Sequence, residues 1–174
     1  MSEPFLHECI AVLSRTPAVV DAALRGLPEP WTTANEGPET WSAYDVIGHY
    51  IHGEKTDWVP CIEIILAHGE SVPFTPFDRF AQFRESQGKT LEQLLDEFTA
   101  QRKNSLRKLE GLNITEEQLA LTGIHPEFGR VVLKQLIATW VTHDLNHLNQ
   151  INRVMAKRLT EAVGPWKEYI LIVQ

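Results

Sequence analysis

The feature that most constrains the fold is a C-terminal stretch, from about Arg130 to Leu159, that contains neither proline nor glycine. A run of helix-forming residues of this length predicts one helix roughly 45 Å long, at about 1.5 Å per residue. Its apolar side chains recur at helical period and form one stripe: Leu133, Ile137, Trp140, Leu148, Ile151 and Met155. A long helix with one apolar face needs partner helices to cover that face.

Three further segments carry the same amphipathic pattern and can supply those partners. They span about Phe5–Leu27, Ser42–His68 and Leu91–Leu109. Pro17 interrupts the first segment and is expected to kink or divide it. Because four long amphipathic segments occur without persistent strand alternation, the sequence predicts an all-α fold. We expect a four-helix bundle in a single domain over residues 1–174.

Short extra helices are expected in the connections between the long ones. Phenylalanines at three-residue spacing predict a turn of helix between Phe77 and Ser86. The sequence Thr115-Glu-Glu-Gln118 resembles a capping box at the start of another brief helix. The segment from Gly123 to Gly129 is expected to be a loop.

Charge and composition exclude several classes of partner. The 16 lysines and arginines are scattered through a chain whose formal net charge is −7. Nucleic acids and anionic membranes both attract clustered basic residues, so neither is an expected partner. The apolar runs fall far short of the roughly 18 residues of a membrane span, and the N-terminus lacks the pattern of a signal peptide. Cys9 and Cys61 match no disulfide framework and are expected to be buried thiols. These features predict a cytoplasmic protein.

His143 and His147 are the first candidates for chemistry. On a helix, residues four apart are neighbours on one face, so two imidazoles at this spacing can converge on one metal ion. The pair lies at the edge of the apolar stripe, with Gln150 farther round on the same side. That position suits a cleft between helices. Two histidines at this spacing also occur by chance, so an ordinary pair of core or partly exposed histidines stays open as the alternative.

Two acidic residues fall within apolar stripes, where an ionised carboxylate is costly unless it is paired. Asp144 lies near the middle of the last stripe and is either a proton-handling acid or, as we favour, a carboxylate bonded to an indole, hydroxyl or cation. Glu54 is either a buried partner for a histidine or cation, or a sign that the helical wheel is rotated. His49 and His52 lie off the stripe of the second helix, so periodicity predicts both to be exposed and cannot choose between them.

Short motifs in these two helices resemble the DinB/YfiT-like family of metalloenzymes. The second helix begins with Trp41-Ser42, carries His49 eight residues after the tryptophan and has Glu54 five residues beyond the histidine. The late helix carries His-x3-His with a glutamine three residues on, here His143, His147 and Gln150. The resemblance covers most of the chain.

The resemblance implies a four-helix bundle with His49, His143 and His147 as a three-histidine metal centre. Three neutral imidazoles leave at least one coordination position open, which is typical of catalytic sites. The divalent ion could be Zn, Ni, Fe, Mn or Cu, because imidazole ligands suit several metals. The other histidines have no motif position and are expected to be surface or structural, although His125 could border the cleft.

The implied activity is that of a metal-dependent enzyme of the thiol transferase or hydrolase type, acting on a small molecule. A low-molecular-weight thiol is a candidate substrate. Glu54 or Asp144 could act as general base or could orient a ligand histidine, and Gln150 could line the substrate site. The alternative is a non-catalytic, stress-related metal-binding or dimeric structural protein. The sequence is also compatible with a homodimer, since exposed apolar helix faces pair between subunits.

Overall fold

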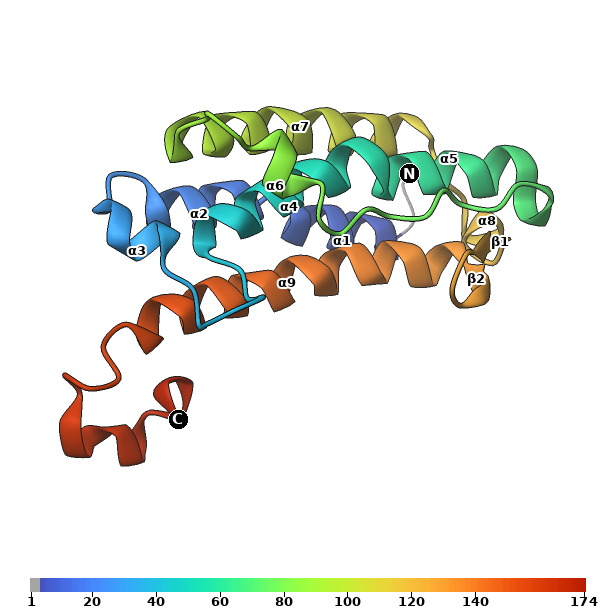
Figure 1. Cartoon of the computed structure of the whole chain (residues 1–174). Helices are drawn as coiled ribbons and strands as arrows, with labels where there is room; N and C mark the ends of the chain where they lie inside the picture. Colours follow the sequence, from blue (N-terminus) through green and yellow to red (C-terminus); the bar gives the residue numbers. More distant parts are fainter. Residues whose placement is uncertain (1–3) are drawn as a thin grey trace.

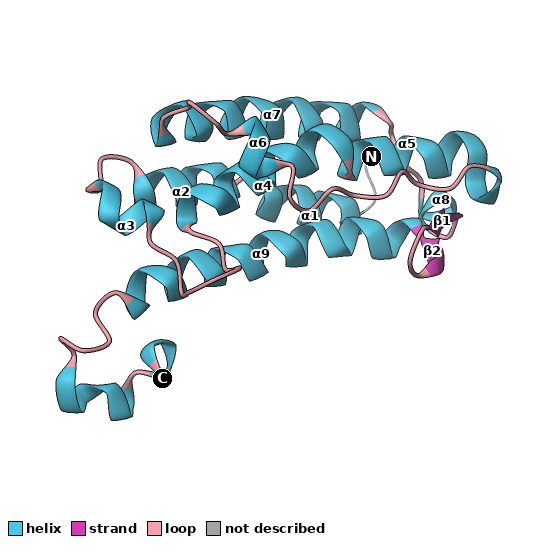
Figure 2. Cartoon of the chain, in the orientation of Figure 1, coloured by secondary structure: helices cyan, strands magenta, loops and turns pink. Residues whose placement is uncertain are grey.

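The computed structural model describes residues 4–174, and helices dominate it (Figures 1 and 2). The helices are α1 (Pro4–Leu13), α2 (Thr16–Leu24), α3 (Glu29–Thr33), α4 (Ala43–Thr56), α5 (Trp58–His68), α6 (Gln82–Glu85), α7 (Leu91–Gly111), α8 (Glu116–Leu119) and α9 (Leu133–Lys157). Two short strands, β1 (Thr122–His125) and β2 (Gly129–Val132), and three 3-10 turns, η1 (Gly69–Ser71), η2 (Gly164–Tyr169) and η3 (Leu171–Val173), complete the chain.

Four helical rods form the bundle, which confirms the predicted fold class. They are α1–α2, α4–α5, α7 and α9, and Figure 1 shows α4 and α5 running in tandem along α9. α4 contacts both α7 and α9, α1 contacts α9, and α2 contacts α7. The first rod is divided as expected, with Pro17 in the first turn of α2, where its missing N–H leaves no bond unmade.

The second rod, expected to be one helix, is broken at Asp57. Its start is as expected, because Ser42 Oγ accepts a hydrogen bond from the backbone of Asp45 in a capping box. Asp57 has φ −116° and ψ −73°, and a new helix begins at Trp58. Pro60 follows three residues later and cannot donate the backbone hydrogen bond that would join the two helices. The break therefore follows from the missing donor.

The prediction of a loop between Gly123 and Gly129 is wrong. β1 and β2 form an antiparallel hairpin in which Thr122 pairs with Val132 and His125 pairs with Gly129. Gly129 has φ +71°, a conformation that glycine adopts without strain. The hairpin takes the first residues predicted for the last helix, so α9 begins at Leu133.

Gly123 lets the hairpin pack closely on the bundle. A Cβ atom at this position would lie 2.7 Å from Ile65 Cγ1 and 3.1 Å from the Phe74 ring. The backbone N–H of Phe74 also donates to the carbonyl of Ile124, at 2.9 Å. The hairpin and the segment that follows η1 are therefore joined at one end of the bundle.

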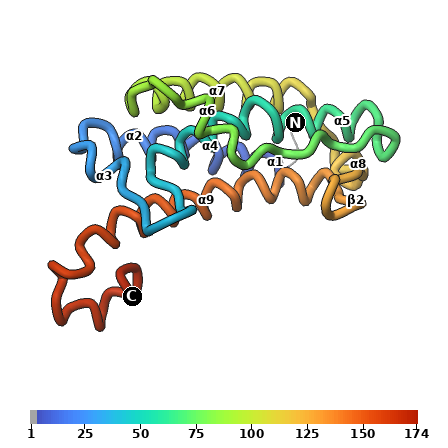
Figure 3. Tube along the Cα trace, viewed as in Figure 1, coloured from blue at the N-terminus to red at the C-terminus, as the bar shows by residue number. Residues whose placement is uncertain are grey.

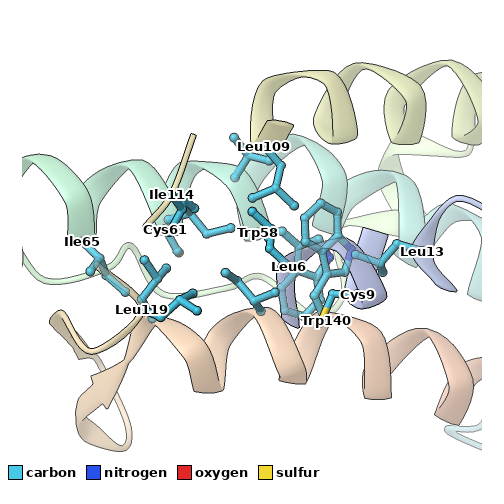
Figure 4. Packing of buried hydrophobic residues seen from close by; sticks show 14 of the residues in the cluster. Leu6, Cys9, Leu13, Trp58, Cys61, Ile65, Leu109, Ile114, Leu119 and Trp140 are labelled. Atoms are coloured by element: carbon cyan, nitrogen blue, oxygen red, sulfur yellow. The ribbon is translucent and has the colours of Figure 1, made fainter. Parts of the chain in front are cut away.

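Two apolar clusters hold the helices together. Figure 4 shows the cluster around Trp58 and Trp140, whose rings stack with centroids 5.8 Å apart. Cys9 and Cys61 lie in this cluster as buried thiols, as expected. The second cluster surrounds Tyr50, which stacks on Phe98 with centroids 4.9 Å apart.

Beyond α9 the chain leaves the bundle and ends in the turns η2 and η3 (Figure 3). η3 contacts α9 again, and Val173 is buried there. No described helix combines the length and the apolar character that crossing a lipid bilayer requires.

Candidate metal centre

Three histidines from two helices converge in the middle of the bundle. α4 supplies His49, and α9 supplies His143 and His147. One nitrogen of each ring lies within 4.8 Å of the others, and His49 Nε2 lies 2.9 Å from His143 Nε2. The ring centroids of His143 and His147 are 4.4 Å apart. The contact between α4 and α9 thus joins residues 94 positions apart in sequence.

The prediction that His49 and His52 are exposed is wrong, because the two side chains are only 5% and 6% exposed. α4 contacts α3, α5, α6, α7 and α9, and every residue from Val46 to Glu54 is buried. A helix covered on all sides has no solvent face, so an apolar stripe does not show which of its residues are accessible.

The structure brings His49, and not His52, to the α9 histidines. His52 Nδ1 lies 3.2 Å from a carboxylate oxygen of Glu85, and its ring packs on Phe77 with centroids 5.0 Å apart. His52 therefore serves the contact between α4 and the segment around α6.

The environment keeps the imidazoles of His49 and His147 uncharged. Burial, together with the neighbouring His143 and His147, lowers the pKa of His49 to about 2. Burial and His143 lower the pKa of His147 to about 4, although the hydrogen bond to Gln150 opposes the change. Neutral rings retain the lone pairs that metal coordination requires.

Hydrogen bonding also orients the nitrogens. His147 Nδ1 donates to Gln150 Oε1 at 2.7 Å, since an amide oxygen can only accept, and this leaves the Nε2 lone pair for a ligand. The Nδ1 atoms of His49 and His143 are buried without a hydrogen-bond partner. Gln150 thus orients a candidate ligand, as outer residues of metal sites commonly do, and its place in a substrate site stays a prediction.

The three rings fit a metal ion. Bonds of about 2.05 Å at tetrahedral angles place ligand nitrogens roughly 3.3 Å apart. His49 Nε2 and His143 Nε2, at 2.9 Å, are already closer than this, and the widest separation of 4.8 Å needs a contraction of roughly 1.5 Å to reach the same tetrahedral spacing. Rotation of a histidine side chain about its χ1 and χ2 bonds is enough to move a ring nitrogen by that distance.

Glu54 and Asp144 lie in a separate buried network centred on Arg102. Arg102 donates to Asp144 Oδ2 from Nη1 at 2.6 Å and to Asp144 Oδ1 from Nη2 at 3.0 Å. It donates to Glu54 Oε1 from Nε at 2.8 Å. Thr16 donates to Asp144 at 2.6 Å, and Trp140 Nε1 donates to Glu54 at 3.2 Å. Asp144 thus has the hydroxyl and cation partners of the interpretation favoured above, and Glu54 is a buried partner of a cation.

The pKa values of the two carboxyl groups change in opposite directions. Burial raises the pKa of Glu54, although Arg102 opposes this change. Burial would also raise the pKa of Asp144, but His143, Arg102 and Thr16 outweigh it and lower that pKa. His143 Nδ1 lies 3.9 Å from Asp144 Oδ1, which is too far for a hydrogen bond.

A cavity of about 570 Å³ contains the three histidines. It is lined by Trp41, His49, Gly53, Asp57, Trp58, Phe74, Thr75, Pro76, Phe77, Arg79, His125, Pro126, Glu127, Phe128, His143 and His147. The walls are largely aromatic, and the hairpin turn with His125 forms part of the rim. Neither Glu54, Asp144 nor Gln150 is among the lining residues. A larger groove of about 870 Å³, between α2 and α7, contains none of the three histidines.

Asp57 is an acidic residue of this cavity that the sequence interpretation missed. It lies at the break between α4 and α5, and its Oδ1 accepts a hydrogen bond from Cys61 Sγ at 3.4 Å. Burial raises the pKa of Asp57, against the Cys61 hydrogen bond and the nearby His143. The helix-breaking Pro60 was the available signal, because it places an acid at a bend of a buried helix.

Comparisons with known proteins agree with this architecture. The family model of the DinB superfamily matches residues 13–151. The structure of YfiT from Bacillus subtilis, described as a probable metal-dependent hydrolase with an unusual four-helix bundle topology, superposes with a TM-score of 0.76 at 17% identity. The match covers 91% of this chain and 90% of YfiT. No curated protein matches the chain. With a four-helix bundle, a three-histidine cluster between α4 and α9 and a family match over most of its length, the chain belongs to the DinB superfamily.

Proposed function

We propose that this protein is a metal-dependent hydrolase of small molecules, with His49, His143 and His147 as the ligands of a divalent ion. The observation that carries the proposal is the convergence of three histidine ring nitrogens inside a cavity. Among the described residues, the group that could hold an ion contains these three side chains and no fourth ligand. A site with three protein ligands leaves room for water or substrate, as in catalytic zinc centres.

An ion held there would supply Lewis acidity toward a water molecule or a substrate carbonyl. The protein side chains do the rest of the work. Trp41 stacks on His147 with ring centroids 5.9 Å apart, and Trp58 packs against His143 at 4.9 Å. These aromatic rings hold the ligands in place and exclude bulk water, which strengthens electrostatic interactions inside the cavity. The size and the aromatic walls of the cavity suit a small organic substrate.

YfiT has a similar fold and is described as a probable metal-dependent hydrolase, which favours hydrolysis over transfer for this chain. A low-molecular-weight thiol could enter the same cavity as the attacking group, which would make the protein a thiol transferase. A panel of small esters and amides, run beside a panel of thiol-conjugation reactions, separates the two activities. Hydrolysis without any thiol requirement is the expected result.

Metal content tests the ligands directly. Elemental analysis of untagged protein should show that His49→Ala, His143→Ala and His147→Ala each lose most of the bound metal. His52→Ala is the matched control, because His52 is equally buried on the same helix and should keep its metal. Full metal retention by any of the first three variants would refute the proposed ligand set.

A further inference from the structure

We propose that Asp57 is a catalytic residue of this site, which accepts the proton of the attacking water or thiol and then passes it to the leaving group. The inference rests on the proposed function and adds a residue to it. Asp57 lines the same cavity as the three histidines. The adjacent Trp58 packs on His143 with ring centroids 4.9 Å apart, so the chain at the bend lies close to the three histidines.

Close packing fixes the position of this bend. A Cβ atom on Gly53 would lie 3.1 Å from Trp58 Nε1, so the absence of a side chain at Gly53 lets the indole lie against α4. The backbone N–H of Asp57 donates to the carbonyl of Gly53 at 3.0 Å. Asp57 is thus held one turn after Gly53, beside a buried indole.

The Asp57 carboxylate has capacity for a further hydrogen bond. Its side-chain partner among the described residues is the Cys61 thiol, a weak donor that contacts one oxygen only. Asp144, in contrast, uses both oxygens to bind Arg102, and Glu54 accepts from Arg102 and Trp140. A carboxylate that must accept a proton needs an accessible lone pair, and Asp57 alone of these three acids lines the cavity.

The surroundings of Asp57 suit proton transfer. Its side chain is partly buried, and burial raises the pKa of its carboxyl group although His143, His125 and His52 lower it. Glu127 is the other carboxylate among the described cavity residues, but it is exposed on the hairpin turn, where solvent screens its charge. Desolvation of Asp57 makes its carboxylate a stronger base than an exposed one.

The proposed step is balanced within the protein and its substrates. The O–H bond of water, or the S–H bond of a thiol, breaks, and its electron pair forms the new bond to the electrophilic carbon of the substrate. The proton moves to a carboxylate oxygen of Asp57. It is then donated to the leaving group as the bond to that group breaks, which restores the carboxylate.

Two probes test the role of Asp57 without a known substrate. The visible spectrum of cobalt(II)-loaded protein reports binding of azide, an anion with no proton to give, and of acetohydroxamic acid, which loses a proton when it chelates an ion. Asp57→Asn keeps an oxygen to accept from Cys61 but cannot take a proton. This variant should lower the affinity for acetohydroxamic acid by about tenfold or more, because the proton acceptor is lost. The same variant should raise the affinity for azide by about threefold, because a negative charge is removed.

A purely structural role of Asp57 would not change the affinities for the two probes in opposite directions. Glu127→Gln removes the exposed carboxylate of the same cavity and should leave both affinities unchanged. If Asp57→Asn fails to fold by circular dichroism, Asp57→Ser repeats the test. Changes of the same sign, no change, or an equal effect of Glu127→Gln would overturn the role of Asp57 alone. If neither probe perturbs the cobalt spectrum of the wild-type protein, the open metal site itself is refuted, and the inference with it.

Discussion

Replacement of Arg102 by methionine is the sharpest test of how the bundle is held together behind the three-histidine cluster. Methionine fills much of the same volume and cannot donate a hydrogen bond. The guanidinium is 1% exposed and donates to Glu54, Asp144 and the carbonyl of Leu13. Its removal leaves Asp144, which is fully buried, with Thr16 as its remaining side-chain donor within hydrogen-bond distance among the described residues.

The expected loss follows from which carboxylate can become neutral. Glu54 takes up a proton more easily than an exposed carboxylate, because burial raises its pKa. The penalty therefore falls on Asp144, which is fully buried and would lose both of its hydrogen bonds from Arg102. Breaking a buried ion pair by removing one partner costs about 3–5 kcal/mol. For a chain of this size that corresponds to a decrease in melting temperature of about 6–20 °C.

Urea denaturation and calorimetry of Arg102→Met measure this loss. Arg130→Met is the matched control, because the Arg130–Glu70 pair is exposed, at 70% and 37%, and should contribute less than about 1 kcal/mol. The double variant Arg102→Met with Asp144→Asn should be more stable than the sum of the single losses by more than about 1 kcal/mol. A loss for Arg102→Met no larger than that of the control would refute the reasoning.

Three further predictions follow from individual contacts. Asp144→Asn should lower the melting temperature while metal content stays near that of the wild type, and the reverse ranking would argue for a role of Asp144 in the metal site. Gln150→Leu removes the acceptor that orients His147 and should weaken metal affinity by about 10–100-fold with little loss of stability, measured by competition with a chelator. Gly123→Ala should destabilise the protein by about 1–3 kcal/mol in urea, because the new methyl group would lie 2.7 Å from Ile65. Gly111→Ala is its control, with no atom within 4 Å of the added carbon, and an equal loss there would contradict the packing argument.

The helical pattern predicted the architecture well but misjudged the surroundings of α4. Hydrophobic periodicity identified the four rods, and the capping box at Thr115 is present as expected. Periodicity then predicted His49 and His52 to be exposed, and both are buried. Periodicity detects a helix with one covered face, whereas residues 46–54 of α4 are all buried by the elements packed around them.

The sequence also named Asp144 and Glu54 as buried acids without identifying their partner. Arg102 was not distinguished from the other basic residues of α7, because a buried arginine on a charged helix has no local signature. Its two carboxylate partners lie 42 and 48 residues away along the chain. Only the packing of α4, α7 and α9 shows that one cation neutralises both.

By itself the sequence determined the helices and the spacing of His143 and His147, because backbone hydrogen bonds and the i, i+4 relation depend on neighbours along the chain. The tertiary structure decided which histidine joins that pair, which acids bind Arg102 and that Asp57 lines the cavity. Each of these depends on contacts between distant segments and on burial, which exist only once the helices have packed around one another.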